Sequence, residues 1–386
     1  MSSVDGGGVA KAVLPRDGVP ARRKFVAAAA GSVIAGFPMI SVAQSSSTLL
    51  RLQCAWSAKD IFYEYALDFA KKINDMSGGR LRIEMLPAGA VVKAQDLQDA
   101  VHRGVVDGCH AVPALWHPRN AAFSLFGCGP ALGMDGNGLL AWLRYGGGMD
   151  LYLELVHRQL NLNVLPFFTG PMPAQPLGWY RKPVQSAADI RGLRVRAYGL
   201  AADLFREMGA RPVTLPVDEV AVAWRRGEID AAALNNPSTD DALGMPDIAK
   251  VCMLRSQHQT AEVFEVLLNR ARFNALPADL QAIVRHAADA ASADMSWKAL
   301  QRYSADQAQM RDREGVQFRK TSQDFLRRQM LGWKAVVARH APTNPFFDRV
   351  WQSQRTWARR TVGWLRDSVP DPAMAHEFWA ADQSVK

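Results

Sequence analysis

Apolar and polar positions in the first third of this chain follow one repeating order. They alternate over 50–56, recur at helical spacing over 60–76, and alternate again over 80–85. A second helical pattern near 94–102 leads into an apolar strand pattern near 105–112. Strand, helix, strand, helix and strand at this spacing predict a parallel sheet covered by helices.

The same order returns further along the chain. Its strand and helix patterns lie at 192–196, 200–208, 211–215, 217–226 and 229–234. A short signature accompanies both units, because Arg103-Gly104-Val105-Val106-Asp107 and Arg226-Gly227-Glu228-Ile229-Asp230 stand at equivalent helix-to-strand junctions. In each, glycine ends the helix and aspartate caps the turn into the next strand. We therefore expect two similar α/β lobes.

The rest of the chain has a helical pattern. Between Pro277 and Gly315 the pattern has no internal proline or glycine, and a helix of that length can reach from one lobe to the other. Asn344 and Pro345 form a helix start, with asparagine as cap and proline in the first turn. The stripe that follows contains Phe347, Val350, Trp351, Gln354, Ala358, Thr361 and Leu365, flanked by Trp357 and Trp364. Two interpretations stay open: the stripe packs on its own lobe, or it docks onto a second subunit.

The N-terminus has the pattern of an export signal. Arg22-Arg23 precede an apolar run over 25–40, which is typical of a twin-arginine signal. Ser41-Val42-Ala43 then places small residues where a signal peptidase reads them, so we expect residues 1–43 to be removed. An ordinary secretory signal is the alternative. The run is short for a membrane anchor and contains glycine and proline, so we expect a periplasmic protein.

Charge and cysteine content narrow the possible functions. The formal net charge of +9 comes from scattered lysines and arginines rather than from a basic arm, so nucleic acid is not expected as a partner. A mild basic excess suits a small anionic ligand. The four cysteines (Cys54, Cys109, Cys128 and Cys252) form no CxxC pair and lie near no zinc-spaced histidine. They are expected to be buried free thiols, with one disulfide as the alternative.

No constellation typical of catalysis stands out. The sequence contains no HExxH, GxSxG or GxxxxGK[ST] motif. Gly146-Gly147-Gly148 follows a helical pattern rather than a strand and is expected to be a helix end and turn. His110, near a strand end, is expected to be a structural histidine. The chain has two predicted lobes, an export signal and no recognisable group of catalytic residues. These features predict a periplasmic binding protein, a ligand trap that closes on a small molecule, and not an enzyme.

Several stretches resemble one family of such traps. They are 69–72 with 76–81, 86–92, 138–143 with 145–148, 178–182 and 190–196. In order and spacing they resemble the solute-binding proteins of tripartite ATP-independent periplasmic (TRAP) transporters. The similarity covers nearly all of the chain after the signal. It is greatest to the branch that binds 2-oxo and 2-hydroxy monocarboxylates.

The resemblance implies an α/β, two-lobed periplasmic solute-binding protein fold. Each lobe is then a mixed sheet flanked by helices, with a long interlobe helix and an extended C-terminal helix. The implied boundaries are 44–168 with about 258–297 for lobe 1, 169–257 with about 298–344 for lobe 2, and 345–386 for a C-terminal dimerisation helix and tail.

Arg196 matches the family's carboxylate-binding arginine. A planar guanidinium offers two parallel donors at carboxylate spacing, and a cleft between lobes excludes the water that would screen the pair. Arg194 lies two residues earlier on the same predicted strand face. From the residues alone either arginine could be the anchor, or both could be exposed; the resemblance selects Arg196.

Other candidates follow from the same comparison. Gln175 stands four residues before Trp179, as in the family pattern, where this glutamine contacts the ligand and a nearby cation. The family carries Trp-Glu or a similar pair after the last strand of this unit; here the Glu becomes Ala233 and the Trp becomes Leu234, which removes an oxygen ligand and argues against a bridging cation. No cofactor is expected. Ligand contacts in this region are therefore assigned to Gln175, Trp179, Asn235 and Asn236.

Three aromatic residues complete the candidate set. Trp56 and Tyr63 follow the first predicted strand, and Trp116 follows the third. Ligands gather at strand ends in α/β proteins, so each could form an apolar wall over the ligand. Ordinary core packing is the equal alternative for all three.

The function implied is capture of a small organic acid and its delivery to a membrane permease. The partners are then a small organic anion, the TRAP permease subunits and, through the C-terminal helix, a second copy of the chain. A periplasmic ligand sensor is the alternative, because trap and sensor share the same physics. An enzyme acting on a carboxylate is a further alternative, although no matched acid and base pair supports it.

Overall fold

The computed structural model describes residues 47–381. The signal predicted over 1–43 lies outside this range. No helix among the described residues combines the length and apolar character that crossing a membrane requires.

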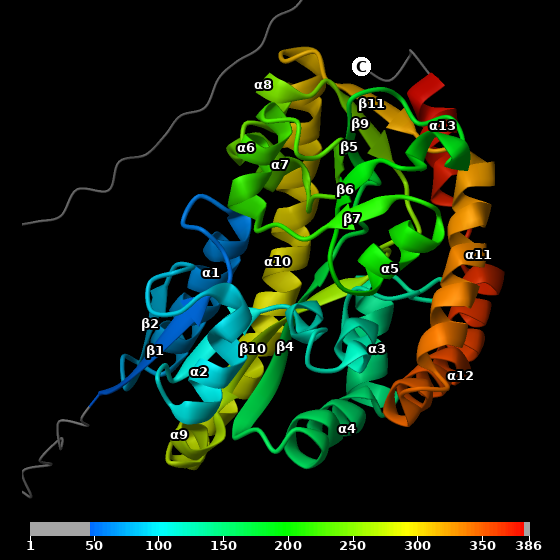
Figure 1. The fold of residues 1–386 in the computed structure, drawn as a ribbon. Helices are drawn as coiled ribbons and strands as arrows, with labels where there is room; N and C mark the ends of the chain where they lie inside the picture. Colours follow the sequence, from blue (N-terminus) through cyan, green and yellow to red (C-terminus); the bar gives the residue numbers. More distant parts are fainter. Residues whose placement is uncertain (1–46, 382–386) are drawn as a thin grey trace, which may run out of the picture. The chain divides into compact units, whose positions relative to one another are not determined.

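Lobe 1 is built on a five-stranded sheet in the order β2-β1-β3-β10-β4 (Figure 1). Its strands are β1 (Thr48–Cys54), β2 (Leu81–Leu86), β3 (Gly108–Ala111), β4 (Val164–Met172) and β10 (Glu262–Asn269). β1 is parallel to β2 and β3, whereas β10 is antiparallel to β3 and β4. The predicted parallel unit is thus confirmed, and β10, from much later in the chain, makes the sheet mixed.

Lobe 2 contains a six-stranded sheet in the order β11-β9-β5-β8-β6-β7. Its strands are β5 (Gly178–Tyr180), β6 (Arg194–Arg196), β7 (Arg211–Val213), β8 (Ala231–Ala232), β9 (Val251–Leu254) and β11 (Gln317–Lys320). β6 is parallel to β7 and β8, as the second repeat predicts, and β5 is antiparallel to β8 and β9. The strands are shorter than predicted: β6 has three residues and β8 has two.

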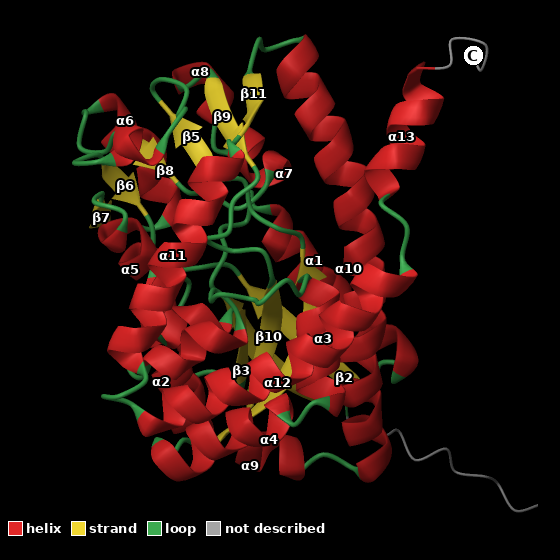
Figure 2. Cartoon of the chain, turned by 90° about the vertical axis from the view of Figure 1, so that its right-hand side faces the viewer, coloured by secondary structure: helices red, strands yellow, loops and turns green. Residues whose placement is uncertain are grey.

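Helices cover both sheets (Figure 2). They are α1 (Ile61–Met76), α2 (Leu97–Arg103), α3 (Gly136–Tyr145), α4 (Gly148–Leu153), α5 (Gly199–Glu207), α6 (Val220–Arg225), α7 (Pro237–Ala242), α8 (Met245–Ile248), α9 (Arg270–Asn274), α10 (Ala278–Asp312), α11 (Gln323–His340), α12 (Pro345–Ser368) and α13 (Pro372–Ala381). Short 3₁₀ turns precede α2 and α6. As predicted, Gly146 ends α3, and Gly147 (φ 83°) begins the turn into α4.

Three segments connect the two sheets. One runs from β4 to β5, a second runs back from β9 to β10, and the third is α10, which packs against α1 and β4 of lobe 1 and α7 of lobe 2. The Gln175 N–H donates to the Gln259 carbonyl at 3.0 Å, so the first two segments lie side by side. The prediction that the long helix reaches both lobes is confirmed, and α10 passes both sheets in Figure 1.

The C-terminal helices begin as predicted. The Asn344 side chain accepts a hydrogen bond from the Phe347 N–H at 3.0 Å and caps α12. The first half of α12 packs on lobe 1, with Phe347, Val350 and Ala358 buried. Trp364 is 65% exposed, so the second half of the stripe is not packed against another described part of the chain.

All four cysteines are buried free thiols, as predicted. Cys54 and Cys109 lie on strands of lobe 1, and Cys252 lies on β9 of lobe 2. His110 is also structural: its Nδ1 accepts a hydrogen bond from Trp56 Nε1 at 2.9 Å. Burial lowers the pKa of His110 to about 3, so the ring is neutral.

Candidate ligand-binding site between the lobes

Arg196 ends strand β6 and is only 5% exposed. Its Nη1 donates to the Ala233 carbonyl at 2.8 Å and its Nε to the Leu215 carbonyl at 3.2 Å. The guanidinium lies over the Tyr198 ring, 5.2 Å from the centroid. A guanidinium has five N–H donors, so these two bonds fix its orientation and leave three donors for a ligand.

Arg194 lies in a different environment. Its Nε and Nη2 donate to the two carboxylate oxygens of Asp230 at 2.9 and 2.7 Å. Its side chain is 42% exposed. Arg194 is therefore neutralised at the surface, whereas no described residue forms a salt bridge with Arg196. The structure separates the two arginines that the sequence leaves equivalent.

Gln175 lies in the segment between β4 and β5 and is buried. Its Nε2 donates to Asn235 Oδ1 at 3.3 Å, and its Oε1 lies 3.4 Å from His258 Nε2. Burial lowers the pKa of His258 to about 3, so this imidazole is neutral and can donate from Nε2 while Nδ1 bonds Ser256. Gln175, Asn235 and His258 thus form one polar cluster beside the hinge segments.

Asn236 and Trp179 each form a hydrogen bond with a residue in the first turn of α7. The Asn236 side chain accepts from the Thr239 N–H at 2.9 Å and caps the helix. Trp179 Nε1 donates to Asp240 Oδ2 at 2.7 Å. Burial raises the pKa of Asp240 to about 7, and the Trp179 bond opposes that shift. Arg196 is near enough to Asp240 for the two charges to interact, so α7 begins at the edge of the arginine site.

The cluster also receives groups from lobe 1. Thr239 Oγ1 of α7 donates to Asp60 Oδ1 at 2.8 Å, and the same oxygen caps α1 by accepting from the Phe62 N–H. The Cys128 thiol lies between the two lobes, near the charge of Arg196 and of Glu262. Side chains from both lobes therefore enclose the polar groups around Arg196.

The three remaining sequence candidates lie elsewhere in lobe 1. Trp56 is buried, donates to His110 and packs edge-on against Phe62. Trp116 is buried and donates to Glu265 Oε1. Tyr63 is partly exposed on α1 and donates to the Met85 carbonyl at 2.9 Å. Among the described residues, none of the three forms a side-chain hydrogen bond to the cluster around Arg196, so their assignment to the ligand stays a prediction.

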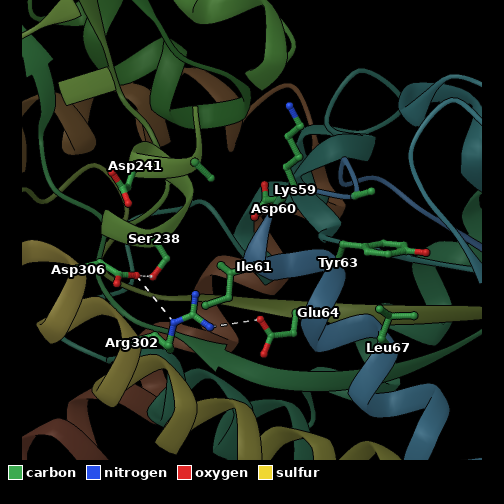
Figure 3. Close-up of a pocket in the computed structure, with 12 residues that line it drawn as sticks. Lys59, Asp60, Ile61, Tyr63, Glu64, Leu67, Ser238, Asp241, Arg302 and Asp306 are labelled. Carbon is green, nitrogen blue, oxygen red and sulfur yellow. Dashed lines mark hydrogen bonds and ion pairs between the residues drawn. The ribbon is translucent and has the colours of Figure 1, made fainter. Parts of the chain in front are cut away.

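A pocket of about 330 Å³ lies next to this cluster, where α1, α7 and α10 meet (Figure 3). Arg302 reaches across it to Glu64 at 3.4 Å, and Ser238 donates to Asp306. The charged residues that line it are Lys59, Asp60, Glu64, Asp241, Arg302 and Asp306. Carboxylates outnumber cations there, so the pocket does not suit an organic anion, and we assign it to the contact between the lobes.

Five residues that the sequence analysis does not name belong to this candidate site: Tyr198, Asp240, His258, Gln259 and Glu262. Gln259 bonds the Tyr198 side chain and donates to Glu262. Two acidic residues, Glu262 and Glu265, interrupt the apolar run that forms β10. A carboxylate in an otherwise buried strand is a signal that could have identified Glu262 from the sequence.

Two lobes, a hinge and a buried, preoriented guanidinium with unused donors define a periplasmic-type binding protein for a small organic anion. The chain belongs to the bacterial extracellular solute-binding protein family 7, whose model matches residues 53–342, and is a solute-binding protein of the TRAP type. Proteins of this family bind small organic anions in the periplasm and work with a membrane permease.

Individual relatives agree with this assignment. The chain is 26% identical over 319 residues to a monocarboxylate 2-oxoacid-binding periplasmic protein of Nostoc sp., covering 82% of this chain and 85% of the relative. A TRAP periplasmic solute-binding protein of Colwellia psychrerythraea, solved with bound calcium and pyruvate, is 26% identical and has a TM-score of 0.79. The match covers 86% of this chain and 100% of the Colwellia chain. The corresponding protein of Pseudoalteromonas atlantica, solved with sodium and pyruvate, is 25% identical, covers 88% and 100%, and has a TM-score of 0.78.

Proposed function

We propose that this protein captures a small 2-oxo or 2-hydroxy monocarboxylate between its lobes and delivers it to a TRAP permease. The observation that carries the proposal is Arg196: a buried guanidinium held by two backbone carbonyls with three donors unused. Relatives of similar length support the ligand class, since one is a 2-oxoacid-binding protein and two were solved with pyruvate. The carboxylate would take two of the free donors in a bidentate pair.

The remaining polar groups suit the second functional group of such an acid. Gln175, Asn235 and the Tyr198 hydroxyl are uncharged, and together they supply both donors and acceptors near Arg196. Uncharged amides and hydroxyls hydrogen-bond a keto or hydroxyl oxygen without adding a second charge. One fixed cation with neutral neighbours therefore favours a monocarboxylate over a dicarboxylate.

The two pyruvate structures also contain a bound cation, but a cation does not fit the residues of the candidate site here. Calcium takes six to eight oxygen ligands, usually including carboxylates. Ala233 supplies only its carbonyl, which already accepts from Arg196. Among residues 47–381, no three histidine, cysteine or acidic side chains are grouped to hold a metal. We therefore assign ligand binding to the protein's own groups.

The proposal is tested by isothermal titration calorimetry of the purified protein with pyruvate, 2-oxobutyrate, lactate, succinate and glucose. We expect at least one 2-oxo or 2-hydroxy monocarboxylate to bind in the micromolar range or tighter, and neither succinate nor glucose to compete. A higher melting temperature with the same acid is the independent check, because a ligand that binds only the folded state stabilises it. Binding of a sugar or of none of the acids would contradict the proposal.

We also propose that the C-terminal helices form a homodimer. Beyond the part of α12 that packs on lobe 1, the apolar side chains of α12 and α13 are exposed: Trp364, Leu365, Val369, Met374, Phe378 and Trp379. So many large apolar side chains on consecutive turns are typical of an interaction surface. Light scattering should give a dimer for the full chain and a monomer after deletion of residues 363–386. A full-length monomer would contradict this.

Export by the twin-arginine route remains a proposal from the sequence. Replacing Arg22 and Arg23 by lysine should retain the protein in the cytoplasm, because that translocon requires the arginine pair, whereas a general secretory signal tolerates lysine. Cell fractionation distinguishes the two routes.

A further inference from the structure

Two buried glutamates on β10 have different surroundings. Glu265 has both carboxyl oxygens occupied, since Trp116 Nε1 and the Tyr152 hydroxyl each donate to one of them at 2.5 Å. Glu262 is 1% exposed, and its Oε2 accepts from Gln259 Nε2. Its Oε1 has no hydrogen-bond partner among the described residues. A buried polar atom without a partner is costly, so Glu262 Oε1 has a hydrogen bond left to make.

Glu262 belongs to the same cleft as Arg196. The Tyr198 hydroxyl and the Cys128 thiol each lie close enough to both groups to feel their charges. Gly127 faces the free oxygen, and a Cβ built at Gly127 would lie only 3.2 Å from Oε1. The absence of a side chain at position 127 therefore lets the lobe 1 backbone pack closely against the Glu262 carboxyl. Contacts run from Glu262 to Gly127, from its neighbour Cys128 to the Tyr198 carbonyl at 4.0 Å, and from the Tyr198 ring to the Arg196 guanidinium, so Oε1 lies on the same side of the cleft as the anchor.

The groups that face Glu262 leave its carboxyl neutral. Gln259 on its own segment is an amide, while Tyr198 at the start of α5 and Cys128 of lobe 1 have pKa values raised by burial. No described lysine, arginine or histidine forms a salt bridge with Glu262. Burial raises the pKa of Glu262 to about 8, and the Gln259 bond only partly opposes it. Since Oε2 accepts from Gln259, the proton resides on Oε1, which makes that atom a donor.

We propose that Glu262 binds the ligand as a neutral carboxylic acid, with Oε1–H donating to the oxo oxygen of a 2-oxo acid whose carboxylate is held by Arg196. This inference rests on the proposed function and narrows its ligand class to acids with an acceptor oxygen at that position. The proton on Glu262 then polarises the oxo oxygen. A bound cation could do the same, but among the described residues no three histidine, cysteine or acidic side chains are grouped to hold one.

The test is calorimetry with pyruvate from pH 6.5 to 9.5, with and without EDTA, for the wild type, Glu262→Gln and Glu262→Ala. In the wild type, loss of the proton removes the donor, so Kd should rise roughly 30-fold between pH 7 and 9.5 for a pKa near 8. Glu262→Gln keeps an N–H donor and should bind within a few-fold of the wild type at pH 7, and its Kd should rise much less between pH 7 and 9.5 than that of the wild type. Glu262→Ala should bind weakly at every pH, and EDTA should change nothing.

Glu265→Gln is the matched control, because it alters a buried glutamate on the same strand whose oxygens are already occupied. It should lower the melting temperature but keep the wild-type pH profile. Asp240, with a pKa of about 7, is present in every variant, so its titration cancels between the profiles. A flat wild-type profile, tighter binding at high pH, or a requirement for calcium or sodium would overturn the inference. If no acid of the panel binds at any pH, the proposed function fails and this inference fails with it.

Discussion

Replacing Arg196 by lysine tests the carboxylate anchor without removing its charge. The guanidinium uses Nε on the Leu215 carbonyl and Nη1 on the Ala233 carbonyl, which leaves three of its five N–H donors free. A lysine ammonium has only three donors. If it satisfies the same two carbonyls, one donor remains for the ligand, and the bidentate pair becomes a single hydrogen bond.

The expected loss follows from that count. One hydrogen bond to a charged group contributes about 1.5–3 kcal/mol, so Kd should rise roughly 10- to 150-fold. The ammonium also lacks the flat face that lies over Tyr198 at 5.2 Å, which removes a further stacking contribution of about 0.5–1 kcal/mol. We therefore expect the upper part of the range.

Arg194→Lys is the matched control, two residues earlier on the same strand. Arg194 is half-exposed and paired with Asp230, so its replacement should leave Kd within about twofold of the wild type. Calorimetry with pyruvate at pH 7 measures both variants, and circular dichroism melting confirms that each is folded. A folded Arg196→Lys protein with wild-type affinity, or equal losses in the two variants, would refute the role assigned to Arg196.

Three further predictions concern closure, pH and backbone fit. Thr239→Val removes the 2.8 Å interlobe bond to Asp60, worth about 1 kcal/mol, so the pyruvate off-rate in stopped-flow should rise about fivefold. The variant also loses the bond that Asn236 Nδ2 donates to Thr239 Oγ1 at 3.0 Å, so the melting temperature should fall as well. An unchanged off-rate contradicts this prediction. Between pH 6.5 and 8 the native state retains protons on Asp240, Glu262 and Glu265 that the unfolded chain has already lost. The free energy of unfolding should therefore fall as the pH rises. In urea titrations, Glu262→Gln should make this fall shallower by at most about 1.4 kcal/mol per pH unit. Gly178→Ala should destabilise by about 3 kcal/mol or more in the same titrations, because φ is 117° and the new Cβ would meet the Ala232 carbonyl at 2.1 Å, whereas Gly192→Ala at open space should cost only about 1 kcal/mol.

Local patterns were enough to predict the longer helices α1, α10 and α12 and the parallel strand units, but not the short helix α7 or the helix α11. Helix α1 begins where Asp60 can cap it, and α12 begins where Asn344 can. Strand β10 was not predicted, although it joins β3 to β4 in the first sheet. Its run is apolar on both faces because it lies in the middle of the sheet, and such a run carries no alternation to reveal it. Its partner strands lie far away in sequence, which no local pattern encodes.

The site could be predicted only in part for a similar reason. The pattern leaves Arg194 and Arg196 equivalent, and resemblance alone selects Arg196; what separates them physically is Asp230, which neutralises the first. Asp240 and Glu262 are ordinary acidic residues in sequence. They become unusual only when the two lobes close around them and burial raises the pKa of each. Such groups are recognised by their surroundings, which come from distant segments.

The first turn of α7 links ligand binding to closure. Asn235 bonds Gln175 beside the hinge, Asn236 caps the helix, and Thr239 reaches Asp60 of lobe 1. Asp240 on the same turn is held by Trp179 and lies near Arg196. A ligand that orders Asn235 and Arg196 therefore also orders the turn that carries the interlobe bond. A ligand shifts the equilibrium between the open and closed states only if it binds one of them more tightly. Because this turn carries both the ligand-binding groups and the interlobe bond, contacts with a small acid here favour the closed state.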